Sequence, residues 1–85
     1  NLYYNLINGG VFIVFIYENN KQVIVEIKKL MLENKVSQKQ IAEVLNITPQ
    51  GFTKLLNKKN FGFEDAKKIL NAMGYNLIVD FQSKG

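Results

Sequence analysis

The spacing of hydrophobic residues predicts two extended segments that flank four helices. Residues 11–17 form a continuous β-branched and aromatic run, which is typical of a buried strand. From about residue 21 the apolar positions recur every three or four residues, which indicates helices. We place them at about 21–34, between Ser37 and Asn46, from Pro49 to about Lys58, and at about 63–73. Residues 75–81 then alternate, apart from Ile78, and predict a second strand.

Polar residues and glycines mark the ends of these helices. Ser37 is a suitable N-cap, and Gln40 three residues later completes a capping box. Thr48 followed by Pro49 is a second helix start, because proline at the first helical position loses no hydrogen bond. Helix ends are predicted at Asn34–Lys35, Asn46 and Gly74, because asparagine and glycine tolerate positive φ.

The composition excludes most catalytic and metal chemistry. The chain has 85 residues, enough for one domain, and contains neither cysteine nor histidine. Their absence removes disulfides, thiol chemistry, most zinc sites and the commonest general base. We therefore predict no catalytic residue, no metal site and no cofactor, and we expect a non-enzymatic protein. A reducing cytoplasm suits a chain without disulfides, so we expect a cytoplasmic location.

The charge pattern favours an anionic partner. All 11 basic residues are lysines, and residues 21–85 carry 11 of them against 6 acids, a net charge of +5. A basic domain of this kind suits nucleic acid. The apolar run at 11–17 is too short to cross a bilayer as a helix, and no lysine precedes it. We therefore expect no signal peptide and no membrane partner.

Residues 38–57 have the pattern of two short helices that cross after a tight turn. Ala42 is small where two helices must approach closely, and Asn46 stands where the chain must reverse. The shared core of the two helices is predicted to consist of Ile41, Leu45, Ile47, Phe52 and Leu55. Every position that this packing requires is filled by a suitable residue.

This segment resembles the helix-turn-helix of the phage-repressor-like (Xre/Cro-type) DNA-binding family. The matching residues are Ser37, Gln38, Ile41, Ala42, Leu45, Ile47, Thr48, Gln50, Phe52 and Leu55. The resemblance covers about residues 22–74 and implies a mainly α, lambda-repressor-like domain of four helices. Asn46 replaces the usual glycine, which is tolerable. Gly51 costs about 1 kcal/mol of helix propensity against alanine, and either lets the backbone approach DNA or has no role.

The resemblance also implies which residues contact DNA, because the second helix of the motif enters the major groove in this family. The implied base contacts are Thr48, Pro49, Gln50, Thr53, Lys54 and Asn57. The implied phosphate contacts are Gln38, Lys39, Lys58 and Lys59. Gln50 can bind adenine in a bidentate manner. A plain solvent-exposed position is the alternative for Gln50, and simple solvation is the alternative for Lys58 and Lys59.

The predicted domain organisation has three parts: an N-terminal extension at 1–20 with its strand at about 11–17, a helix-turn-helix domain at 21–74, and a C-terminal strand and tail at 75–85. We expect the two strands to pair, and two chains to build a four-stranded sheet in a homodimer. That dimer is expected to set two recognition helices about one DNA turn apart, roughly 34 Å. The alternative is that residues 1–20 pack against their own chain or are disordered.

Together these features predict sequence-specific binding to double-stranded DNA, as a transcriptional regulator of the repressor type acting as a homodimer. An alternative in the same fold is an antitoxin that represses its own operon and binds a toxin as its protein partner. A second alternative is a protein-interaction module that kept the fold and lost DNA binding. The lysines of the predicted recognition surface argue against this last alternative.

Overall fold

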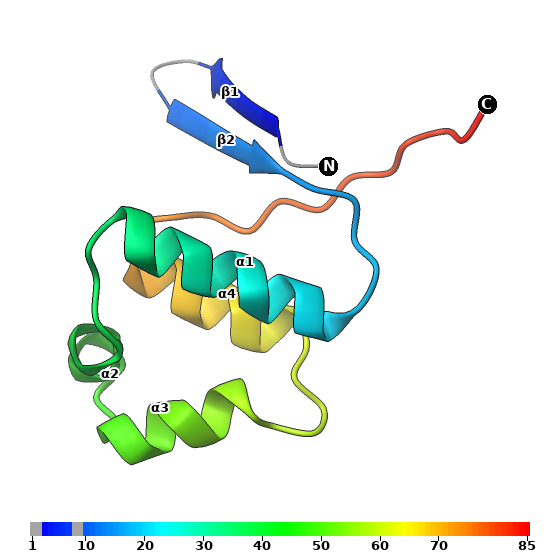
Figure 1. Ribbon diagram of the computed structural model, residues 1–85. Helices are drawn as coiled ribbons and strands as arrows, with labels where there is room; N and C mark the ends of the chain where they lie inside the picture. The colour runs from blue at the N-terminus through cyan, green and yellow to red at the C-terminus, as the bar shows by residue number, and fades with distance from the viewer. Residues whose placement is uncertain (1–2, 8–9) are drawn as a thin grey trace.

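The computed structural model describes residues 3–7 and 10–85, which include the helices α1 (Asn20–Glu33), α2 (Gln38–Leu45), α3 (Pro49–Leu56) and α4 (Phe63–Ala72). The helices α1 and α4 lie side by side, and α3 lies across one face of that pair (Figure 1). Figure 1 views α2 along its axis and α3 from the side, so the two helices of the motif cross. The chain thus has the predicted mainly helical, lambda-repressor-like fold.

Three helices end in the same left-handed turn. At each end one residue has positive φ: Lys35 (55°) after α1, Asn46 (58°) after α2 and Gly74 (85°) after α4. The amide of the next residue then donates to a carbonyl five positions back, as Tyr75 N does to Leu70 O at 2.8 Å. The predictions for Asn46 and Gly74 are confirmed. The predicted end at Asn34–Lys35 is also confirmed, since Asn34 is the C-cap of α1, but the residue with positive φ is Lys35 and not Asn34, whose φ is −91°.

The core lies between α1, α4 and the crossed helices α2 and α3. Phe52 and Ile69 are fully buried, and Ala42 is 1% exposed where α2 approaches its neighbours. The buried apolar residues are Val23, Ile27, Leu30, Met31, Ile41, Ala42, Phe52, Leu56, Phe61, Ala66, Ile69 and Leu70. Every helix contributes to this core, which fixes α3 relative to the rest of the body.

An antiparallel hairpin precedes the helices, formed by β1 (Tyr3–Ile7) and β2 (Gly10–Val14). The predicted strand at 11–17 is shorter than expected, because β2 ends at Val14, which pairs with Tyr3. The strand β1 was not predicted from the sequence. Ile13 and Phe15 pack against the core, whereas Val14 and Ile16 are exposed. The expectation of a fully buried strand is therefore wrong for this part of the run.

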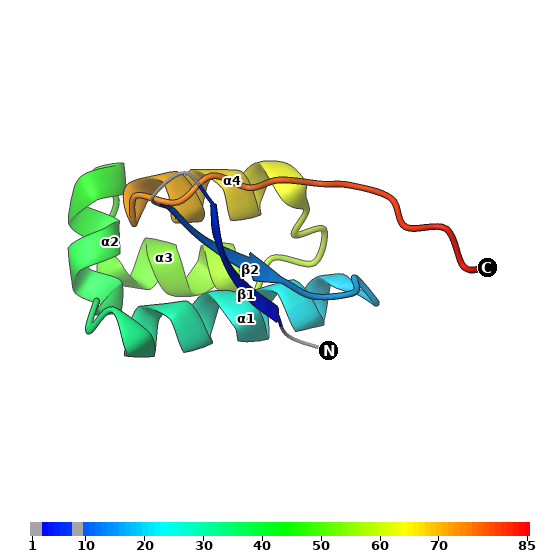
Figure 2. The ribbon, with the colours of Figure 1, turned by 90° about the horizontal axis from the view of Figure 1, so that it is seen from above.

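The C-terminal segment is extended but is not a strand. Residues 75–85 form no sheet pairing, so the predicted strand at 75–81 is wrong, and β2 pairs with β1 instead of with this segment. Tyr75 and Leu77 pack against the core, and the Tyr75 hydroxyl accepts a hydrogen bond of 3.2 Å from Asn34 Nδ2. Beyond Leu77 the segment leaves the body, as Figure 2 shows from above, and Phe81 is 94% exposed.

Candidate nucleic-acid interface

The start of α3 is built by its N-cap. The Thr48 Oγ1 accepts a hydrogen bond of 2.9 Å from the Gly51 amide, and Pro49 occupies the first helical position. A Cβ on Gly51 would lie 3.2 Å from that same hydroxyl oxygen. Glycine at position 51 therefore leaves room for the cap, which is a local reason for a residue that otherwise weakens a helix.

One face of α3 is fully available to a ligand. Gln50, Thr53, Lys54 and Asn57 follow at spacings of three and four, so they share one side of the helix. All four are exposed, whereas Phe52 and Leu56 on the other side are buried. The arrangement presents amide, hydroxyl and ammonium groups on the surface opposite the core.

The polar residues of this face differ in how far they are already engaged. The Thr53 Oγ1 donates to the Pro49 carbonyl at 3.2 Å, and the Asn57 Nδ2 donates to the Thr53 carbonyl at 3.0 Å. Gln50 and Lys54 form no side-chain hydrogen bond or ion pair with the part of the chain that the structure describes. These two side chains therefore have their full hydrogen-bonding capacity for an external partner.

The start of α2 supplies a second group of exposed polar residues. Ser37 caps the helix by accepting from the Gln40 amide at 3.1 Å, and the Gln40 side chain accepts from the Ser37 amide at 2.8 Å. The predicted capping box is therefore present. Gln38 and Lys39 are exposed at this positive helix end, which suits a phosphate group.

Lys58, one of the residues predicted to contact phosphate, has a partner within the protein. Its Nζ lies 3.2 Å from Asp65 Oδ1, and the Asp65 carboxylate also accepts from the Gly62 amide at 2.9 Å. The hydrogen bond from that amide and the nearby Lys58 ammonium hold the pKa of Asp65 below its usual range, despite its burial. Lys58 thus secures the start of α4, while Lys59 is exposed and has no such contact in the described structure.

A groove of about 460 Å³ beside the end of α3 adds two lysines that the sequence analysis did not single out. Its walls come from the first half of α1 and from the loop after α3, and the Asn20 amide donates to the Phe61 carbonyl across it. The lysines that line the groove are Lys21, Lys28, Lys58 and Lys59. Only the packing of α1 against that loop brings them together, so no local sequence signal marked the first two.

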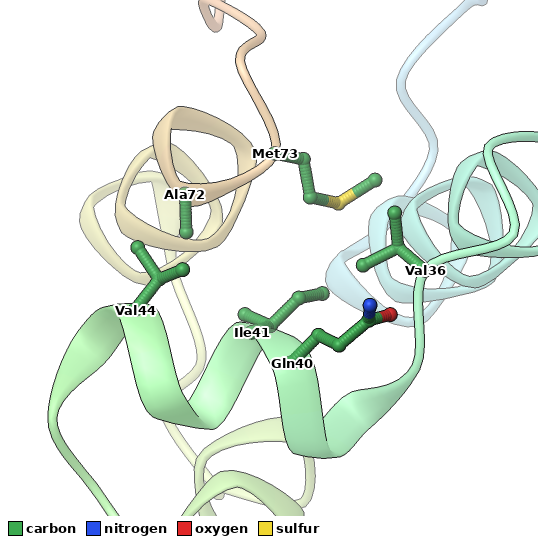
Figure 3. A pocket seen from close by; sticks show the side chains of 6 residues that line it. All are labelled: Val36, Gln40, Ile41, Val44, Ala72 and Met73. Atoms are coloured by element: carbon green, nitrogen blue, oxygen red, sulfur yellow. The ribbon is translucent and has the colours of Figure 1, made fainter.

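A second, smaller hollow is a poor candidate for a small-molecule site. A hollow of about 200 Å³ lies between α2 and the end of α4, with Val44 facing Ala72 and Met73 beside Val36 (Figure 3). Ligand pockets usually measure about 300–1,000 Å³, and Gln40 is the one polar side chain that lines this hollow. Among the described residues no group of acidic side chains is arranged to hold a metal ion. No described helix has the length and apolar character needed to cross a bilayer.

Comparison with known families decides what this arrangement of helices is. The family model described as Helix-turn-helix matches residues 27–79, which is more than half of the chain. The chain belongs to the Xre/Cro-type helix-turn-helix family. No curated protein and no solved structure gave a match.

Membership indicates the class of partner, because this is a family of DNA-binding regulators. The helix-turn-helix protein described here carries ten lysines and five acidic residues between Lys21 and Gly74, a net charge of +5. Double-stranded DNA is therefore the partner of the helical body. The matched residues include Tyr75–Val79, whereas the β1–β2 hairpin lies outside them.

Proposed function

We propose that this helix-turn-helix protein is a sequence-specific transcriptional regulator of the repressor type, which reads the major groove with α3 and acts as a homodimer. The observation that carries the proposal is the exposed polar face of α3, with its core residues on the opposite side. A regulator that blocks a promoter needs only to bind its site, which such a face can do.

Each residue of the face has a role that follows from its chemistry. Gln50 at the second position of α3 is free to make two hydrogen bonds to adenine N6 and N7. Lys54, one turn later, has the length to reach a guanine edge or a phosphate. Thr48, Pro49, Thr53 and Asn57 complete the surface toward the bases, and the methyl groups of the threonines suit the thymine methyl.

Phosphate contacts fix this helix in the groove. Gln38 and Lys39 are offered by the start of α2, and Lys59 by the loop after α3. Lys58 contributes its charge while it stays paired with Asp65. Lys21 and Lys28 extend the basic surface beyond the motif, since they line the same groove as Lys58 and Lys59.

The test is selection of bound DNA from a random duplex library with the full chain. A recurring sequence motif is expected, with binding that weakens steeply as salt rises because phosphate contacts release counterions. Selected pools without any shared motif would contradict sequence-specific regulation and favour general DNA binding. Absence of binding at low salt would contradict the proposal altogether and favour a protein-interaction module.

A further inference from the structure

The hairpin leaves an edge that is open to another strand. β1 pairs with β2 from Tyr3–Val14 to Ile7–Gly10, and its other edge has no strand partner in the described chain. Proteins usually protect such edges with charged residues or proline. Residues 1–17 contain neither, and the first charged residue is Glu18. A lone hairpin is also only marginally stable, so this edge favours a partner strand.

The open edge lies far from α3. Ile13 of β2 packs against the helical core, so β2 is the inner strand. Figure 1 places β1 beyond β2, on the side of the α1–α4 pair opposite α3, and Figure 2 shows β1 crossing above β2. The edge therefore stays accessible when α3 lies in a DNA groove.

A second copy of the chain fits this edge better than a charged partner does. Two β1 strands that pair antiparallel about Asn5 bring Tyr3 opposite Ile7 and Tyr4 opposite Leu6, which are favourable aromatic–aliphatic pairs. No like charges meet, because β1 has none. The segments outside Lys21–Gly74 carry one lysine and two acids, so self-pairing there keeps the two +5 helical bodies apart.

We propose that β1 pairs edge to edge with β1 of a second copy, which gives a four-stranded antiparallel sheet at the centre of the homodimer. In such a pair the two-fold axis passes between the two β1 strands and perpendicular to the sheet. Since each helical body lies beyond its own β2, the two bodies lie on opposite sides of the central strands. The two α3 helices then face away from each other.

This arrangement determines how the dimer binds DNA, on the premise that α3 is the DNA-reading helix of the proposed function. Two outward-facing α3 helices do not reach successive major grooves of one straight duplex. Each dimer therefore holds two separate DNA segments, one on each outer end. The sheet thereby links two operator sites instead of doubling the contact with one.

The sheet is tested by cross-linking, which the natural absence of cysteine makes unambiguous. Asn5→Cys places one thiol at the centre of the proposed pair, where the two Cα atoms lie about 4.5–5.5 Å apart, within disulfide range. Ser83→Cys in the exposed tail is the matched control. Mild oxidation at micromolar concentration is expected to link Asn5→Cys at least tenfold faster than Ser83→Cys. Equal rates would overturn the sheet while leaving the proposed function untouched.

The two-duplex claim is tested with the cross-linked Asn5→Cys dimer and two differently labelled duplexes that each carry the library-selected site. Capture of one duplex is expected to retain the other, with one duplex bound per protomer. Leu6→Lys, which places like charges in the pair, is expected to abolish co-capture while each monomer still binds one duplex. Co-capture that persists in Leu6→Lys, or one duplex bound per cross-linked dimer, would overturn the claim. If none of the variants bound DNA, the proposed function and the two-duplex claim would both be rejected. The rate of cross-linking would still show whether the sheet forms.

Discussion

The helical body and the extended segments of this chain have opposite physical characters. Residues 21–74 are strongly basic and contain every fully buried side chain among the described residues. The hairpin, the linker to α1 and the tail carry almost no charge, yet they expose Ile16, Ile78, Val79 and Phe81. One region therefore suits a polyanion, and the other suits a strand or an apolar protein surface.

The contrast teaches that residues of one type have different roles in the two regions. The tail contains Phe81, Gln82 and Lys84, all exposed and all remote from α3. The body contains Phe52 in the core, Gln50 on the free face of α3, and Lys59 in the basic groove. These three residues of the tail are therefore chemically matched controls for the phenylalanine, the glutamine and the lysine of the body.

The largest difference is expected between the two phenylalanines. Phe52→Ala removes a fully buried ring and should lower the free energy of unfolding by about 3–5 kcal/mol, enough to unfold a domain of this size. Phe81→Ala removes a ring that is 94% exposed and should change stability by less than about 0.5 kcal/mol. Urea titration followed by circular dichroism measures both. Similar losses for the two variants would mean that the tail packs on the body.

Asp65 gives the next largest effect. Asp65→Ala removes a buried carboxylate that binds the Gly62 amide and Lys58, and should cost about 2 kcal/mol at pH 7. Because the folded pKa of Asp65 is lowered, its stabilisation is present above the unfolded pKa of about 3.9 and is lost as pH falls through the folded value. The difference in stability between wild type and Asp65→Ala should therefore shrink in acid. A difference that stays constant from pH 7 to pH 2 would contradict this role. Asp65→Asn keeps an acceptor for the Gly62 amide and should therefore lose less stability than Asp65→Ala.

A smaller effect of the opposite sign is expected at Lys35. Its φ of 55° strains a residue that has a Cβ, so Lys35→Gly should raise the free energy of unfolding by about 1 kcal/mol. Asn46→Gly is the comparison, with a smaller gain because asparagine tolerates this conformation. The midpoints of urea unfolding report both changes. A loss of stability in Lys35→Gly would show that the lysine side chain contributes more than the strain costs.

The lysines are expected to give the smallest effect, seen in the salt dependence of DNA binding. Lys59→Ala should flatten the slope of log affinity against log salt by about one unit and weaken all sequences alike. Lys84→Ala removes the same charge from the tail and should leave that slope unchanged. Lys59 serves here instead of Lys58, whose loss would also disturb Asp65. Equal slopes for the two variants would remove Lys59 from the phosphate contacts.

Sequence alone predicted the body well and the extended segments poorly, for a physical reason. Helices are set by local signals, and the Ser37–Gln40 capping box and Thr48–Pro49 start are present as predicted. A strand depends on a partner. Alternation at 75–81 therefore predicted a strand that does not form, and the run at 11–17 is a strand only as far as Val14.

The residues of the candidate site also divide into those that local sequence signals indicate and those that depend on contacts between separate elements. The residues of the α3 face were implied by the family resemblance, and helix periodicity agrees in placing Gln50, Thr53, Lys54 and Asn57 on one side. The Lys58–Asp65 pair and the position of Lys21 and Lys28 beside the loop after α3 arise from tertiary packing. No periodicity in the sequence reports such contacts between separate elements.

Sequence preference at Gln50 tests the central claim, that the free face of α3 reads DNA, most directly. The measurement compares the affinities of wild type, Gln50→Ala and Gln82→Ala for the library-selected site and for each of its single-base variants. Gln50→Ala is predicted to lose about 1–3 kcal/mol of discrimination at one base pair and to keep its folding stability. Gln82→Ala is predicted to match wild type at every position. A Gln50→Ala variant with the preference of wild type throughout would contradict the assignment of α3 as the reading helix.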